Sequence, residues 1–507
     1  MIAPLHREQT LDLSREPLGA GWLRRRPTNA ETQEVAGPSV WRTGPRLRFR
    51  DELCAALDGA REVALLCSFL LADDRLAAAV LRAAQRGVRV YVLTSSEQRI
   101  GKVVREDDVF EEGMAEQHKK LLESLAGKVL LRSAAHIHAK FLVVDPRDPG
   151  ARAWLSTANF NKALENSVEL GVKLDAEGAR ALAACFQWAF WSEAERELRG
   201  PHRLIEIETN HPAAPQRPAD DTVCATLRDG TALREQLLAL VGGARREILA
   251  ASYGIDADHV TVRALIEAAQ RGVRVTVLTR PRTVVAVGVA ALAAAGVSVV
   301  AHDKLHAKAL VVDGRALVMS ANLEAMGLDS GFEVGAILPS DAARGVEETL
   351  RDWASTFPWV YRADATRAEH IGDFCPADAG LRNGVVKVTE AHSQAMPAVV
   401  AQDALALDAA PAPVMSPSPA AGTVPRRVTF TWDVQPPSLP QGATERMRNV
   451  QREEGDKESA RTTKGRVPHD PPVFEHGGRV YVVLTRGEDI DRARHVAADL
   501  GATVVLR

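Results

Sequence analysis

The chain has 507 residues, of which 46% are hydrophobic and 25% charged, and its formal net charge is −3. This composition excludes disorder of the whole chain, and the near-zero charge excludes a protein that is basic throughout, as a general binder of nucleic acid or anionic membrane would be. The five cysteines include no CxxC pair, which argues against a disulfide framework or a cysteine-rich zinc module and favours a cytoplasmic protein.

Residues 1–44 are predicted to form an arginine-rich N-terminal extension. The chain begins MIAPLHREQTLDLSREP, with charges where a secretory signal needs an apolar run. Further on, Trp22, Trp41 and Phe49 alternate with arginines in GWLRRRP and WRTGPRLRFR. This pattern suits contact with a phosphate backbone. An arm that is solvated, or that docks on the core, is an equal alternative.

An internal repeat dominates the next part of the chain. Residues 60–94 and 244–279 share the segment AAQRGVRV, and each reads as an apolar strand, a turn, an amphipathic helix, a glycine and a second strand. Such alternation predicts β-α-β units around a buried parallel sheet. We therefore expect an α/β fold with two repeats, 45–200 and 230–362, packed as a pseudo-twofold pair of α-β-α sandwiches and joined by a linker at 201–229.

The run 283–301 carries no charge and approaches the length of a membrane span. It is rich in alanine and glycine, however, and Gly296 divides it into a plausible helix and a plausible strand. We expect a buried helix–turn–strand and no stable membrane insertion.

Two copies of one motif carry the chemistry. The spacing HxKx4D occurs once in each repeat, and an asparagine follows each copy. Residues i and i+2 of a strand point to the same face, so the histidine and lysine of each motif should lie side by side. The motif residues are His138, Lys140, Asp145 and Asn159 in the first repeat and His306, Lys308, Asp313 and Asn322 in the second.

The segments HAKFLVVD…STANFN…ENSVELGV and HAKALVVD…SAN…FEVGAI resemble the phospholipase D superfamily over about residues 45–362. The resemblance implies a two-repeat phosphodiesterase that works without metal or other cofactor through a phosphohistidine. It implies His138 as the nucleophile and His306 as the acid that protonates the leaving oxygen. The first copy departs from the pattern because PRDPGARA separates Asp145 from Asn159, which reads as a longer hairpin turn.

The remaining site residues have expected roles around these two imidazoles. Groups expected to hold the phosphoryl oxygens are Lys140, Lys308, Asn159 and Asn322. Carboxylates expected to accept an imidazole N–H are Asp145 and Asp313 or, as equally good candidates, Glu169 and Glu333. Residues expected to contact substrate or line the cleft are Ser156, Ser320, Ser68 and Tyr253.

Two histidine pairs could instead be read as metal ligands. His136 with His138 forms an HxH pair, and His302 with His306 forms an HxxxH pair. Both lie on predicted strands, whereas the HxxxH zinc geometry needs a helix. We therefore expect no metal site.

The fold does not by itself identify the substrate. A duplicated phosphodiesterase with tethered accessory regions favours a nuclease in restriction, repair or defence, acting on DNA more than on RNA. The alternative is a phospholipid hydrolase or transphosphatidylase of the phospholipase D or cardiolipin synthase type. A second alternative is a nucleic-acid-binding subunit that keeps the motif without turnover.

The last third of the chain changes character. Residues 363–470 are predicted to be a mostly flexible linker, because 396–425 are rich in Ala, Pro and Ser and 442–470 are highly charged. Residues 471–507 predict a small β-α-β tail, with strands at 479–484 and 503–507 around a helix at 489–500. Protein partners are expected to bind through 396–507.

Overall fold

The computed structural model describes residues 7–12, 17–25, 34–97, 99–100, 113–207, 222–228, 230–366, 372–388, 427–432, 473–476 and 479–482. These residues fall into two compact units. The larger unit, Pro17–Ala365 with Gly372–Val388, contains both repeats. In the smaller unit, β1 (Arg7–Asp12) pairs antiparallel with β24 (Arg427–Trp432), and β25 (Val473–His476) pairs antiparallel with β26 (Arg479–Val482).

The first repeat is built on a ten-stranded mixed sheet in the order β12-β11-β7-β6-β5-β8-β9-β10-β4-β3. Its strands are β3 (Val35–Ala36), β4 (Val40–Arg42), β5 (Val63–Ser68), β6 (Arg89–Ser95), β7 (Leu130–Ala134), β8 (Phe141–Val144), β9 (Arg152–Ser156), β10 (Leu170–Leu174), β11 (Arg196–Leu198) and β12 (Leu204–Glu206). Its helices are α1 (Arg48–Asp58), α2 (Asp74–Gln85), α4 (Met114–Leu125), α5 (Ala163–Asn166) and α6 (Ala176–Trp188), which continues as a π-helical turn, η2 (Ala189–Glu193).

The second repeat follows the same plan on a twelve-stranded sheet in the order β14-β13-β20-β19-β18-β15-β16-β17-β21-β2-β22-β23. Its strands are β2 (Pro17–Arg24), β13 (Val223–Leu227), β14 (Gly230–Thr231), β15 (Glu247–Ala251), β16 (Arg274–Thr279), β17 (Ser298–Ala301), β18 (Ala309–Val312), β19 (Arg315–Met319), β20 (Glu333–Ile337), β21 (Trp359–Thr366), β22 (Gly372–Pro376) and β23 (Val386–Val388). Its helices are α7 (Ala232–Gly242), α8 (Val260–Gln270), η3 (Thr283–Val285), α9 (Ala286–Ala294), α10 (Ala325–Leu328), α11 (Ser340–Thr356) and α12 (Leu381–Gly384).

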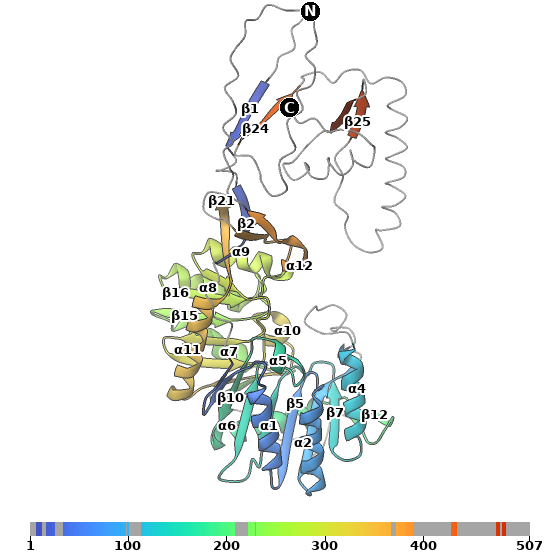
Figure 1. Ribbon diagram of the computed structural model, residues 1–507. Coiled ribbons are helices and arrows are strands. Elements are labelled where there is room, and N and C mark those ends of the chain that lie inside the picture. Colours follow the sequence, from blue (N-terminus) through green and yellow to red (C-terminus); the bar gives the residue numbers. More distant parts are fainter. Residues whose placement is uncertain are drawn as a thin grey trace, which may run out of the picture. The chain divides into compact units, whose positions relative to one another are not determined.

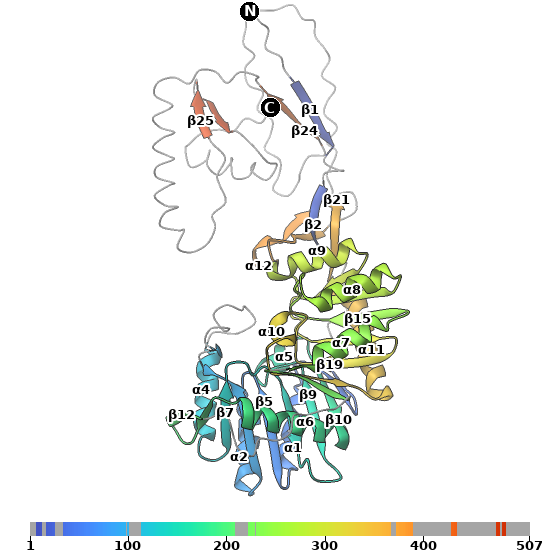
Figure 2. The same ribbon diagram turned by 180° about the vertical axis from the view of Figure 1, so that it is seen from behind.

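The predicted β-α-β units are confirmed. In each repeat two parallel strands flank a helix, β5 and β6 around α2 and β15 and β16 around α8. The shared AAQRGVRV segment ends the helix and turns into the second strand. Gly87 and Gly272 make this turn with the same positive φ of 91°, a conformation that favours glycine. The two repeats lie against each other in Figures 1 and 2.

The uncharged run 283–301 forms the predicted helix and strand, η3 with α9 and then β17. Gly296 makes the turn between them at φ 84°. Of the helices in the described part of the chain, none combines the length and the apolar character needed to cross a membrane.

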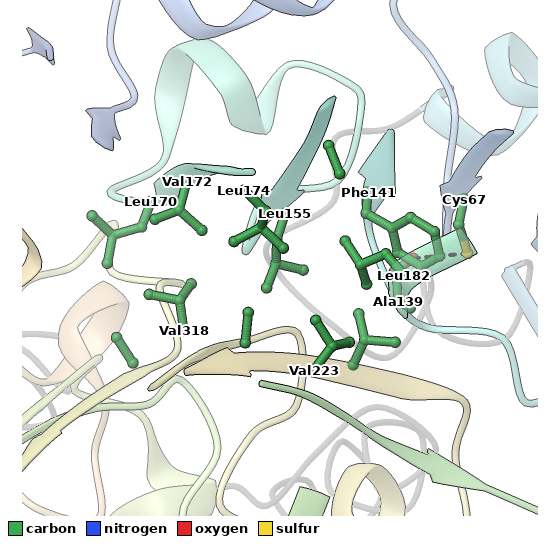
Figure 3. Close-up of a cluster of buried hydrophobic side chains, with 14 of the residues drawn as sticks. Cys67, Ala139, Phe141, Leu155, Leu170, Val172, Leu174, Leu182, Val223 and Val318 are labelled. Carbon is green, nitrogen blue, oxygen red and sulfur yellow. Dashed lines mark hydrogen bonds between the residues drawn. The ribbon is translucent and has the colours of Figure 1, made fainter. Parts of the chain in front are cut away.

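A shared apolar core joins the two repeats. Figure 3 shows Leu155, Leu170 and Val172 of the first repeat facing Val318 and Val223 of the second. The closing helices also cross between repeats, since α6 contacts β13 and β20 and α11 contacts β4. Because both sheets bury one face in this layer, neither repeat keeps its core covered without the other.

The predicted domain boundaries at 44, 201–229 and 362 need correction. Residues 17–24 form β2 between β21 and β22 of the second sheet, and 40–42 form β4 beside β10 of the first. The linker contains β13, which pairs with β20, and the stretch after 362 contains β22 and β23. Strands from outside the predicted repeats extend both sheets, a long-range pairing that no local pattern encodes.

The aromatic residues of the N-terminal extension are core residues. Trp22 packs edge-on against Tyr361 with ring centroids 5.3 Å apart, and Trp41 packs against Phe49 at 5.6 Å. All three predicted aromatics are 5% exposed or less. The alternative in which this segment docks on the core is therefore correct, and these buried rings cannot stack on bases. In the predicted C-terminal tail, 479–482 is a strand of a hairpin, whereas the predicted helix and last strand lie outside the described residues.

Asp145 and Asp313 do not contact the imidazoles, which corrects one of the two carboxylate assignments. Asp145 accepts hydrogen bonds from the backbone N–H groups of Arg61, Glu62 and Val63 at 2.8–3.0 Å. It lies at the end of β8 opposite the motif's histidine and lysine. The repeated spacing of the motif therefore reflects a turn that anchors β5 to β8. Asp145 has a positive φ of 48°, a conformation that Asp tolerates.

Asp313 does the same in the second repeat, with the N–H groups of Arg245, Arg246 and Glu247 at 2.8–3.0 Å. Burial opposes its ionisation, but the three N–H donors outweigh burial and hold the pKa of Asp313 below its ordinary value.

The Asp313→Ala variant should lower the free energy of unfolding by about 2 kcal/mol, because three backbone donors lose their acceptor. Urea unfolding of the purified protein measures this change. The control is Asp258→Ala, an exposed aspartate outside any such turn, which should stay within about 0.5 kcal/mol of the parent. Equal stability of both variants would contradict the anchoring role.

Candidate active site

The backbone of each motif is hydrogen-bonded to the opposite repeat. The N–H groups of His138 and Ala139 both donate to the carbonyl of Phe332, at 3.1 and 2.9 Å, and the N–H of Phe332 donates to the carbonyl of His136 at 2.9 Å. Phe332 immediately precedes β20 of the second repeat. The first motif is therefore held at the start of a strand from the second repeat.

The second motif repeats this arrangement in reverse. The N–H groups of His306 and Ala307 donate to the carbonyl of Val168 at 3.1 and 3.0 Å, and the N–H of Val168 donates to the carbonyl of Lys304 at 2.8 Å. The two sets of bonds bring both HxK segments to one site at the contact between the repeats.

These backbone hydrogen bonds between the repeats bring a glutamate of each repeat into contact with the motif histidine of the other repeat. His138 Nδ1 lies 2.5 Å from Glu333 Oε1, and His306 Nδ1 lies 2.5 Å from Glu169 Oε1. Ionised carboxylates only accept, so each Nδ1 carries a proton and each Nε2 keeps its lone pair. Thr157 donates to the second oxygen of Glu169 at 2.6 Å. The carboxylates that contact the imidazoles are thus those of Glu169 and Glu333, not those of the aspartates.

Burial sets the charge state of both pairs. It lowers the pKa of His138 and lowers that of His306 to about 4. Burial also works against the charge of both glutamates, but the neighbouring histidine and lysine outweigh it and hold the pKa of Glu169 and Glu333 below the ordinary value. Near pH 7 each pair is therefore a neutral imidazole on a carboxylate.

The two motif lysines are fully buried beside the imidazoles. Lys140 Nζ donates to the carbonyl of His138, and Lys308 Nζ to that of His306. Lys308 Nζ also lies 2.8 Å from His306 Nδ1. Burial lowers the pKa of both lysines, to about 7 for Lys308. Each half of the site thus contributes one imidazole and one ammonium group.

The predicted asparagines follow strands that pair with the motif strands, Asn159 after β9 and Asn322 after β19. At the ends of these pairs the N–H of Ser156 donates to the carbonyl of Lys140 at 2.8 Å, and the N–H of Met319 to that of Lys308 at 3.1 Å. Asn159 and Asn322 are buried, and within the described residues their Oδ1 atoms have no hydrogen-bond partner. Polar atoms left unpaired in this way suit a site that receives a polar ligand.

An aromatic ring covers each imidazole. Phe69 packs edge-on against His138 with ring centroids 5.1 Å apart, and Tyr253 packs against His306 at 4.8 Å. The guanidinium groups of Arg282 and Arg280 lie 4.0 and 5.8 Å from the Tyr253 ring. Sequence reasoning included Tyr253 but missed both arginines. Their position just after β16 was the available signal, since β15 and β16 are parallel and end at the same edge of the sheet.

The predicted serines bind backbone rather than facing the imidazoles. Ser68 Oγ donates to the Leu70 carbonyl at 2.7 Å, and Ser156 Oγ to the Ala158 carbonyl at 3.0 Å. Ser320 Oγ accepts from the N–H of Val334 at 3.1 Å. These hydroxyl groups shape the loops that carry Phe69, Asn159 and Glu333.

The two candidate metal pairs are separated by their own partners. His136 Nε2 lies 3.1 Å from Glu193 Oε2, and His302 Nδ1 lies 3.0 Å from Asp303 Oδ1. Across the described ranges, no three His, Cys, Asp or Glu side chains gather in a way that could hold a metal ion.

The sequence matches one family model, described as "Cardiolipin synthase, PLD-like domain", over residues 53–191 and 237–354. These two stretches correspond to the two repeats and together make up about half of the chain. A comparison with curated proteins gives no significant match.

Three solved structures with detectable similarity match different shares of this chain. A polyphosphate kinase from Porphyromonas gingivalis is 14% identical with a TM-score of 0.41, over 60% of this chain and 44% of the kinase. Phosphatidylserine synthase from Haemophilus influenzae is 11% identical with a TM-score of 0.47, over 66% of this chain and 89% of the synthase. Nuc from Salmonella typhimurium, a phospholipase D family member, is 21% identical with a TM-score of 0.24, over 28% of this chain and 96% of Nuc.

The family match covers both repeats, and the two HxKx4D motifs that it contains meet in one site. This chain belongs to the phospholipase D superfamily.

Proposed function

We propose that the protein is a nuclease that cleaves phosphodiesters through a phosphohistidine intermediate on His138. The observation that supports the mechanism is the crossed pairing of His138 with Glu333 and of His306 with Glu169. Each glutamate orients its imidazole and leaves Nε2 available, so one histidine can attack phosphorus while the other handles the proton of the leaving alcohol.

The steps balance within the residues of the site. His138 Nε2 forms a bond to phosphorus as the bond to the leaving oxygen breaks, and that oxygen takes the proton of His306. Water then gives a proton back to His306, attacks phosphorus and releases His138. In this scheme two ammonium groups and two amides surround the non-bridging oxygens and stabilise their charge. They belong to Lys140, Lys308, Asn159 and Asn322. An incoming phosphodiester adds a negative charge that favours protonation of His306.

The preference for nucleic acid rests on the cations around Tyr253, the ring that packs on His306. The two buried lysines are offset by the two buried glutamates, whereas Arg280 and Arg282 add two guanidinium groups around Tyr253. Additional cations beside a phosphodiester site suit a polyanion, whose neighbouring phosphates need their own contacts.

A phospholipid substrate is the second candidate, favoured by one feature of the same segment. Val284 and Val287, just after Arg282, are 68% and 72% exposed. Exposed valines near an active site suit contact with a lipid surface. The printed description of the family model, which names cardiolipin synthase, also supports this candidate.

The two histidines should be separable by the leaving group. His138→Ala should abolish turnover of every phosphodiester. His306→Ala should abolish cleavage of alkyl esters but retain a burst of about one equivalent of p-nitrophenolate from bis(p-nitrophenyl) phosphate, because p-nitrophenolate leaves without a proton whereas hydrolysis of the phosphohistidine still needs His306 as base. Rapid-quench release of p-nitrophenolate, beside steady-state rates with an alkyl ester, measures this. If His306→Ala gives no burst and His138→Ala does, the two roles are reversed.

The value of kcat/KM should fall as pH rises through about 7. Lys308, with a pKa of about 7, is charged below that pH and neutral above it, so its hold on the phosphate is lost on the alkaline side. The negative charge of bound phosphate raises the pKa of Lys308, so the decline belongs to kcat/KM rather than to kcat. A rate constant kcat/KM that stays flat from pH 6 to 9 would contradict this assignment.

Labelled single- and double-stranded DNA and RNA should be cleaved in the presence of EDTA. The affinity of the His138→Ala variant for DNA or RNA should fall steeply as the salt concentration rises. Adding Arg282→Gln to that variant should lower the slope of log affinity against log salt by about one. The matched control is Arg315→Gln, an exposed arginine at the opposite end of the sheet. Absence of cleavage, together with hydrolysis of phospholipid vesicles, would reject the nuclease and favour the second candidate.

A further inference from the structure

The two halves of the site differ at one pair of positions. After the strand-end serine and the aromatic ring, the first repeat has Leu70 and the second has Gly254. Two residues after the asparagine, the first repeat has Asn161 and the second has Glu324. The aromatic ring also differs, Phe69 against Tyr253, but only these two positions replace uncharged side chains with a glycine and a carboxylate, so this difference should affect specificity.

In the first repeat these two positions are part of the core. Leu70 is fully buried in a small apolar cluster with Met114. Asn161 Nδ2 lies 3.0 Å from Met114 Sδ, and Asn161 Oδ1 accepts from the N–H of Ala163 at 2.8 Å. Both hydrogen-bonding ends of Asn161 are therefore engaged within the repeat.

In the second repeat the same place holds a carboxylate. Glu324 Oε1 accepts from Asn322 Nδ2 at 2.8 Å, and a Cβ on Gly254 would come within 2.4 Å of Glu324 Oε2. Gly254 thus makes room for the carboxylate, where Leu70 fills the space in the first repeat. Gly254 directly follows Tyr253, which packs on His306, so Glu324 lies on the His306 side of the site.

The carboxylate of Glu324 does not cap the helix that it precedes. Glu324 occupies the N-cap position of α10, yet its side chain makes no capping bond and turns to Asn322 instead. It is partly exposed and lies near Lys308. A negative group beside a phosphate site repels the phosphate, so it is useful there only if it accepts a hydrogen bond from another part of the substrate.

We propose that Glu324 is a specificity residue that accepts a hydrogen bond from a hydroxyl group next to the ester oxygen on the alcohol that occupies the His306 side. This proposal rests on the proposed role of His306 as the acid for that alcohol. Within the nuclease proposal, the matching group is the ribose hydroxyl beside the leaving oxygen, which deoxyribose lacks. A glycerol head group offers the same chemistry.

The test uses the second half of the reaction, in which an added alcohol can replace water. The alcohol forms the new O–P bond, its proton passes to His306, and the P–N bond to His138 breaks. With bis(p-nitrophenyl) phosphate as donor, ethylene glycol and 2-methoxyethanol compete as acceptors that differ only in one hydrogen-bond donor. The ratio of the two transfer products, measured by chromatography, reports recognition of the hydroxyl group.

The parent protein should favour the glycol by roughly tenfold, the effect of one hydrogen bond to a charged group. Glu324→Asn, which copies the first repeat, should reduce the ratio to about two, the statistical advantage of a glycol with two hydroxyl groups that can attack. Gly254→Ala, which displaces the carboxylate without removing it, should reduce the ratio as well. The control Glu348→Gln removes an exposed carboxylate on α11 and should keep the parent ratio. An unchanged ratio in Glu324→Asn, or equal loss of both products in a folded variant, would overturn the proposal.

A second comparison distinguishes the source of the hydroxyl group. If the parent cleaves RNA faster than 2′-O-methyl RNA of the same sequence, and Glu324→Asn loses that preference, the ligand is ribose. If neither RNA is cleaved while phosphatidylglycerol vesicles are hydrolysed with the same dependence on Glu324, the ligand is a glycerol head group. The second result would overturn the nuclease proposal and still support the role of Glu324.

Discussion

The exchange of backbone hydrogen bonds between the two repeats is the constraint on which the site depends. The carbonyls of Phe332 and Val168 each accept two N–H groups from the motif of the opposite repeat, and the glutamate that follows each carbonyl thereby reaches the opposite imidazole. Neither repeat can complete a histidine–carboxylate pair alone. The apolar layer between the sheets stabilises the contact that both pairs require (Figure 3).

The same contact explains how four charged side chains stay buried together. Lys140, Lys308, Glu169 and Glu333 are each at most 1% exposed, and an isolated ion in that position would be strongly unfavourable. Two cations beside two carboxylates compensate for one another, and neutral imidazoles add no charge. Burial lowers the pKa of both lysines and both histidines. The negative charge of an approaching phosphodiester acts in the opposite direction and favours the protonated form of all four groups.

The two repeats contribute equivalent motif residues to the site and differ in the residues around them. In the proposed mechanism the groups that act on phosphorus come from both repeats, because an in-line displacement has an attacking and a leaving side. The residues around them differ, with Phe69 and Leu70 in one repeat and Tyr253 and Gly254 in the other. The half-site with Glu324 and the nearby arginines is polar, whereas the equivalent positions of the first repeat are packed into core.

Local periodicity and spacing were enough to predict the two β-α-β repeats, the helix and strand within 283–301 and the two HxK pairs. They also identified Glu169 and Glu333 as candidate partners of the imidazoles. The tertiary structure decided what depends on distant contacts. It assigned β2, β4 and β13 to the sheets, since strand pairing joins segments far apart in the chain. It also chose the glutamates over Asp145 and Asp313: a strand separates each aspartate from its histidine, whereas packing of the repeats brings each glutamate to the histidine of the other.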